Sequence, residues 1–122
     1  MTLGGIGETA QTAVDEMRDD GIKVGLLKLK LYRPFPINEL RELCKNAETL
    51  VVCERAMSIG GMGGPIGFEV RSAFYNEHSK LNIHDIILGL GGRDTKVDDF
   101  KSIVKRALGN KPKEYELIGV RE

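Results

Sequence analysis

Residues 49–74 read TLVVCERAMSIGGMGGPIGFEVRSAF and predict a strand, a glycine-rich loop and a helix in succession. The apolar run from Thr49 to Cys53 is typical of a strand buried on both faces of a parallel sheet. The loop contains Gly60-Gly61-Met62-Gly63-Gly64, and Pro65 suits the first turn of the following helix. One face of that helix carries Ile66, Val70, Ala73 and Phe74.

Strands and helices alternate along the rest of the chain as well. We expect further strands at 1–3, 22–31 and 83–90, and helices over 6–20, 37–43 and 100–107. A last apolar patch at 117–120 suits either an edge strand or a docked tail. This alternation predicts one α/β domain over residues 1–122, with a mostly parallel sheet and helices on both faces. Because three residues are short for a first strand, we expect an upstream strand or domain to be missing or to lie on another polypeptide.

Composition excludes several classes of protein. The chain has 122 residues with 18 basic and 18 acidic side chains, so its net charge is zero, and 41% of its residues are hydrophobic. This hydrophobic content argues against a disordered chain. No apolar run is long enough for a membrane helix, and the first residues lack the basic-then-apolar pattern of a signal peptide. Zero net charge argues against a general binder of nucleic acids or anionic membranes.

Cysteine and histidine offer little for chemistry. Cys44 and Cys53 are too few and too isolated to hold a metal cluster, so we expect buried, reduced thiols and a cytoplasmic protein. His78 and His84 have no clustered partners, and we expect both in polar connections. The sequence also lacks the pattern of a catalytic triad or a nucleophile elbow.

Two glycine-rich segments each permit two interpretations. Gly5 to Ala10 matches the loose dinucleotide pattern GxGxxA, but the next predicted strand ends without the acid that would bind the ribose. Gly60 to Gly64 lies where backbone amides bind anions at a helix N-terminus. We favour a tight reversal or a subunit contact there, because the loop has no lysine or serine to complete a phosphate site.

Three arginines follow the predicted carboxyl ends of strands, namely Arg33, Arg55 and Arg93. Those ends share one edge of a parallel sheet, where ligands of α/β proteins usually bind. The arginines therefore form either an anion site or an ion-pair network that fixes loops or docks them on a partner, and we favour the second. The candidate interface or anion contacts are Arg33, Glu54, Arg55, Gly63, Gly64, Arg93 and Asp94.

Six segments in order resemble one protein family over nearly the whole chain. They are Gly4–Thr9, Asp20–Lys28, Arg33-Pro34-Phe35-Pro36, Glu54-Arg55, Gly63-Gly64-Pro65 with Glu69-Val70, and Gly89–Asp94. Together they resemble the C-terminal transketolase-like domain of the alpha subunit of 2-oxoacid:ferredoxin oxidoreductases, most closely the pyruvate enzyme, pyruvate synthase. The resemblance implies a three-layer α/β/α sandwich whose mixed, mostly parallel sheet has one antiparallel strand.

The resemblance also implies a function. Such enzymes make acetyl-CoA and CO₂ from pyruvate and coenzyme A and pass electrons to ferredoxin, using thiamine diphosphate and iron–sulfur clusters. Those cofactors lie on other parts: an upstream pyrimidine-binding domain, and the beta and ferredoxin-like delta subunits. We therefore expect a structural domain that binds no cofactor or metal, is inactive alone, and assembles with beta, gamma and delta subunits.

Two alternatives remain open at this stage. The chain could belong to the branched-chain 2-oxoacid enzyme, because the substrate pocket lies on other parts of the complex. It could instead be a free-standing module that binds a nucleotide or phosphate through Gly5–Ala10 or Gly60–Gly64. An exposed sheet edge beside Met1 also permits self-association.

Overall fold

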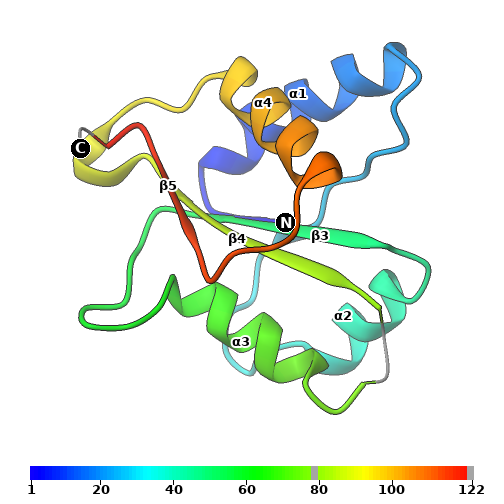
Figure 1. Ribbon diagram of the computed structural model, residues 1–122, viewed down its shortest axis with the longest axis vertical. Helices are drawn as coiled ribbons and strands as arrows, with labels where there is room; N and C mark the ends of the chain where they lie inside the picture. Colours follow the sequence, from blue (N-terminus) through cyan, green and yellow to red (C-terminus); the bar gives the residue numbers. More distant parts are fainter. Residues whose placement is uncertain (78–79, 121–122) are drawn as a thin grey trace.

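A central sheet lies between two layers of helices in the computed structural model, which describes residues 1–77 and 80–120 (Figure 1). The strands are β1 (Thr2–Leu3), β2 (Lys28–Leu29), β3 (Thr49–Glu54), β4 (Asn82–Leu88) and β5 (Glu116–Ile118). The helices are α1 (Ile6–Asp19), α2 (Ile37–Cys44), α3 (Pro65–Phe74), a short 3₁₀ turn η1 (Leu90–Gly92) and α4 (Val97–Gly109).

The strand order is β2-β1-β3-β4-β5. Each of the four strand pairings in the described residues is parallel, because a helix connects every strand to the next and returns the chain to the same end of the sheet. The predicted α/β sandwich is thus confirmed. The mixed sheet implied by the resemblance is not observed, because no antiparallel strand occurs in the described part of the chain.

Two apolar cores flank the sheet. On one face α1 and α4 pack over Cys53, Ile86 and Leu88, and on the other face α2 and α3 pack over Leu50 and Val52. Figure 1 shows these helix pairs on opposite sides of the strands. The alternating side chains of β3 and β4 supply both cores, which explains their continuous apolar sequence.

Three sequence predictions need correction or completion. The strand expected over 22–31 pairs only at Lys28 and Leu29, because β1 offers two positions, Thr2 and Leu3, to pair with. The C-terminal patch 117–120 contributes Leu117 and Ile118 to the edge strand β5, and residues 119–120 lie beyond that strand. His84 is buried in β4 and not in a polar connection, and His78 lies outside the described residues.

Candidate functional site

The carboxyl end of β3 and the middle of β4 carry the candidate site. Glu54 ends β3 and Asp85 lies within β4, and both side chains are buried, with exposed fractions of 2% and 1%. Val52 pairs with Asp85 in the parallel register, so Glu54 is a diagonal neighbour of Asp85 on the same sheet face. That face is covered by α3, and the glycine loop 60–64 leads into its first turn.

Glu54 binds the N-terminus of α3. Its Oε1 accepts a hydrogen bond from the Gly67 N–H at 2.8 Å, and its Oε2 accepts one from the Ile66 N–H at 3.1 Å. The first amides of a helix lack intrahelical partners and carry partial positive charge, so they favour an acidic acceptor. Glu54 therefore does for α3 what a bound anion or a capping side chain would do.

Asp85 completes the arrangement from the next strand. Its Oδ2 accepts hydrogen bonds from the Gly64 N–H at 3.0 Å and from Arg71 Nη1 at 3.4 Å. Asp85 Oδ1 has no hydrogen-bond partner among the residues that the structure describes. Two acidic groups from adjacent strands therefore hold the glycine loop and the start of α3 against the sheet.

The two acids influence each other's ionisation. Burial raises the pKa of Glu54, and the nearby charge of Asp85 raises it further, against the lowering effect of the two backbone hydrogen bonds. Burial also raises the pKa of Asp85, opposed by the Gly64 amide and by Arg71. Arg71 therefore favours the charged form of Asp85, and the charge of Asp85 disfavours the charged form of Glu54.

The glycines of this segment are required by close contact. A Cβ atom would lie 2.3 Å from Asp85 Oδ2 at Gly63, 2.1 Å from Glu54 Cδ at Gly64, and 2.2 Å from Asp85 Oδ2 at Gly67. Gly63 also has a positive φ of 130°. Hydrogen atoms at these three positions make room for the buried carboxyl groups.

The backbone amides at the start of α3 are consequently occupied from within the chain. The amides of Gly64, Ile66 and Gly67 already donate to Glu54 and Asp85, and the Phe68 amide donates to the Gly64 carbonyl. This argues against the alternative in which Gly60–Gly64 binds a nucleotide or phosphate, because the helix amides that would bind the anion are occupied.

The three arginines do not converge on one point. Arg55 directs Nε and Nη2 to the Gly89 carbonyl at 3.4 and 3.3 Å, and the Arg93 side chain lies against Gly119. Arg33 instead pairs with Glu69 of α3 at 2.5 Å and covers the Tyr32 ring. Arg55 and Arg93 thus both border the segment after β4, whereas Arg33 is held at α3.

Comparison with known proteins agrees with this architecture. Residues 1–100 match the family described as pyruvate:ferredoxin oxidoreductase core domain II. The chain belongs to this family. Pyruvate synthase subunit PorA of Pyrococcus abyssi is 39% identical over 127 residues, which cover 100% of this chain and 32% of that protein. PorA of Thermotoga maritima is 35% identical over 124 residues, covering 100% and 31%.

A second group of relatives is named for a different activity. Ketoisovalerate oxidoreductase subunit VorA of Pyrococcus horikoshii is 38% identical over 105 residues, covering 86% of this chain and 26% of the relative. This chain therefore spans about a third or less of the length of these curated relatives. The similarity extends over domain II, and the remainder of each relative has no counterpart here.

Within this domain II, the structure divides the predicted contact residues into two groups. Glu54, Gly63 and Gly64 are buried and bind inside the chain. The exposed group contains Arg33, Arg55, Arg93 and Asp94.

The sequence analysis missed Asp85, Arg71 and Gly67. Asp85 could have been found, because an acid within the apolar run Ile83 to Leu88 must have a partner when it is buried. The pairing with Glu54 depends on the register between β3 and β4, which the residue pattern alone does not specify.

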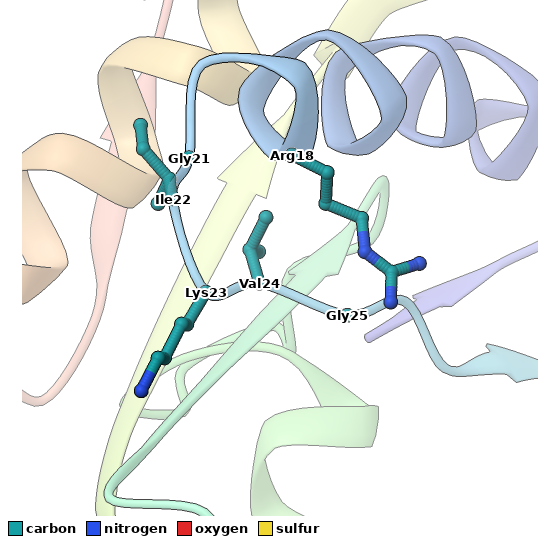
Figure 2. A pocket seen from close by; sticks show the side chains of 6 residues that line it. All are labelled: Arg18, Gly21, Ile22, Lys23, Val24 and Gly25. Carbon is teal, nitrogen blue, oxygen red and sulfur yellow. The ribbon is translucent and has the colours of Figure 1, made fainter.

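The thiols and the open surface of domain II offer little for catalysis. Cys44 and Cys53 are buried and unpaired, and burial raises the pKa of the Cys53 thiol to about 11. A shallow hollow of about 420 Å³ lies at the end of α1, and Figure 2 shows the residues that line it. Arg18 and Lys23 supply cations there, and none of the lining residues is an acid or a nucleophile.

Two further features bear on the class of protein. Within residues 1–77 and 80–120, no group of three or more His, Cys, Asp or Glu side chains is placed to bind a metal. None of the described helices is long and apolar enough to cross a membrane.

Proposed function

We propose that this chain is a structural and assembly domain of the alpha subunit of a 2-oxoacid:ferredoxin oxidoreductase whose substrate is pyruvate. The observation that carries the proposal is the match of residues 1–100 to core domain II, together with the similarity of the whole chain to PorA subunits. In the complete enzyme, pyruvate and coenzyme A would yield acetyl-CoA and CO₂, and ferredoxin would accept the electrons. We place this enzyme in the cytoplasm.

Thiamine diphosphate supplies the carbanion chemistry of such enzymes. The glycine loop of this chain does not fit its diphosphate, because Glu54 and Asp85 occupy the amides that would bind it. We therefore propose that the thiamine diphosphate, and the iron–sulfur clusters, belong to other parts of the complex. This chain would contribute by packing against those parts, namely the thiamine-binding portion and the beta, gamma and ferredoxin-like delta subunits.

The buried acid pair gives this assembly role a physical basis. Glu54 and Asp85 fix the start of α3 and thereby the loop 56–64, whose tip exposes Ile59 and Met62. Exposed apolar side chains on a fixed loop suit burial in a protein interface. We propose that this loop, with the exposed group defined above, contacts neighbouring parts of the complex.

Co-expression with candidate subunits tests the proposal. The chain is expected to co-purify with the thiamine-binding portion and the other subunits, and the assembly to reduce ferredoxin only with pyruvate and coenzyme A. The chain alone should not bind NADH, NADPH, ATP or coenzyme A in calorimetric titrations. Tight binding of any of these by the chain alone, or failure to assemble, would contradict the proposal.

The similarity to VorA subunits favours one other function, the oxidation of branched-chain 2-oxoacids. The same assay separates the two, because 2-oxoisovalerate would replace pyruvate as the better substrate. A higher kcat/KM for 2-oxoisovalerate would assign the chain to the branched-chain enzyme while leaving its assembly role intact.

A further inference from the structure

The outer side of β2 is an open edge of the described sheet. β2 pairs with β1 and ends the strand order. The Thr2 N–H donates to the Leu27 carbonyl at 2.9 Å, so the polar groups of Leu27 face β1. Because successive residues of a strand direct their backbone groups to opposite sides, the N–H and C=O of Lys28 face outward, and the same alternation places those of Lys30 outward. This edge is therefore able to form a further set of backbone hydrogen bonds.

An apolar groove runs beside that edge on the face covered by α2. Its volume is about 180 Å³, and Leu27, Leu29 and Leu31 line it from the strand while Leu40 and Leu43 line it from the helix. Leu31 and Leu43 are 58% and 67% exposed. The groove is adjacent to the unpaired backbone, so one extended segment could use both.

The same edge is basic. Lys28 and Lys30 alternate with the leucines along the segment. Lys28 Nζ pairs with Glu8 Oε1 on the α1 side at 3.0 Å, and both lysines also border the groove. Lys30 is exposed and has no carboxylate within ion-pair distance in the described part of the chain. Glu39 is one of the residues that line the groove, so an acidic side chain of a bound segment is disfavoured on that face.

We propose that this edge binds an extended segment of a partner polypeptide in which apolar and acidic residues alternate. The segment adds a strand outside β2, places its apolar side chains in the groove toward α2, and places its acidic side chains beside Lys28 and Lys30. Backbone pairing supplies affinity, and the alternating side chains supply specificity. The inference rests on the assembly role proposed above, since it assigns one partner contact of that assembly.

A second copy of this chain is a poorer occupant. Antiparallel pairing of two β2 edges about Leu29 would place Lys28 of one copy opposite Lys30 of the other, twice in each dimer. Like charges directly across a strand pair are destabilising, and edge lysines commonly prevent such self-pairing. The arrangement of charge therefore favours a partner with acidic residues.

Fluorescence anisotropy with two peptides tests the proposal. The first is a labelled nine-residue peptide that alternates leucine with glutamate, and the second has lysine in place of each glutamate. At low salt, the glutamate peptide should bind the chain at least about 10-fold more tightly, which corresponds to about 1.4 kcal/mol. Equal binding of both peptides, or no binding of either, would overturn the proposal.

Matched variants locate the site. Lys30→Pro removes an outward N–H and should weaken binding about 10-fold relative to Lys30→Ala, which keeps it. Leu43→Glu places charge in the groove and should abolish binding, whereas Leu108→Glu, an equally exposed leucine on α4, should not. Far-UV circular dichroism confirms that each variant is folded. Unchanged binding by both Lys30→Pro and Leu43→Glu would refute the site.

Sedimentation velocity tests the alternative occupant. If the chain alone dimerises and Leu43→Glu makes it monomeric, the edge serves a second copy and the proposal is wrong. The peptide-binding result is separable from the proposed function. If the other subunits co-purify with this chain while the peptide fails to bind, the edge proposal is wrong and the assembly role stands. Failure of co-purification with intact peptide binding would instead refute the assembly role alone.

Discussion

Replacement of Gly64 by alanine tests whether the buried acids determine the structure of the glycine loop. Gly64 has an extended backbone, φ −94° and ψ 157°, that any residue adopts, so alanine adds no backbone strain. The new Cβ would lie 2.1 Å from Glu54 Cδ and 2.2 Å from Oε1. The Glu54 carboxyl must then move away from the Ile66 and Gly67 amides, to which it is hydrogen-bonded.

The cost follows from two contributions. Overpacking of a buried site destabilises by about 1–3 kcal/mol. A buried N–H that loses its acceptor costs roughly 1–3 kcal/mol, and two are affected here. Because the first turn of α3 can open toward water, we take the lower part of each range and expect a loss of about 3–5 kcal/mol. That is a large fraction of the roughly 5–15 kcal/mol that stabilises a typical domain.

Urea unfolding followed by far-UV circular dichroism measures this loss. Gly5→Ala is the matched control, since Gly5 has φ −61° and open space around its Cβ position. We expect that change to be neutral or to stabilise by about 0.4–1 kcal/mol. In a Glu54→Ala background, Gly64→Ala should cost less than about 1 kcal/mol, because the colliding group is gone. If Gly64→Ala is as mild as Gly5→Ala, the reasoning about the carboxyl contact is wrong.

Three other outcomes are expected. The free energy of unfolding should fall as the pH rises above about 4.5, the ordinary pKa of a glutamic acid, because the raised pKa values of Glu54 and Asp85 leave the folded chain with more bound protons than the unfolded chain. Urea titrations at several pH values measure this, and a profile that rises through the same window would contradict it. Cys44 and Cys53 should resist a thiol reagent at pH 8 in the folded chain and react in urea, because both are buried and the pKa of each is raised; fast labelling without urea would be inconsistent with this. Arg55→Ala should cost about 1 kcal/mol or less in stability, since its hydrogen bonds to a carbonyl are long, yet weaken co-purification with the other subunits. Intact assembly with loss of anion binding would identify an anion site instead.

Much of the fold could be predicted from residue patterns because strong periodicity marked its central elements. The apolar runs of β3 and β4 and the helical stripes of α1, α3 and α4 all form as expected. The residues before β2 misled the prediction, since Ile22, Val24 and Leu26 pack in the core on the α1 side without forming a strand. Whether such a run pairs depends on the length of its neighbour, and β1 has two residues.

The candidate site was only half accessible from the sequence. Glu54 and the glycines 63–64 were identified as notable, but their relation to each other appeared only when β3 and β4 were placed in register. Asp85 of β4 lies opposite Val52 of β3, and Val52 is two residues before Glu54 on the same strand. A shift of one residue in this register would turn one of the two acids to the other face of the sheet. The contact between the two acids is thus a property of the sheet rather than of any local motif.

A glycine-rich loop before a helix has two physical uses that its own residues do not distinguish. In one, the helix amides bind a phosphate from outside; in the other, they bind acidic side chains from the strands beneath. The deciding feature is an acid on the sheet face that the helix covers, either at the end of the preceding strand or within the following strand. Such an acid accepts hydrogen bonds from the helix amides and leaves them unavailable to a phosphate. Here Glu54 and Asp85 both occupy those positions. A loop held in this way has little freedom to close over a ligand and presents a fixed surface, which is what assembly with other subunits requires.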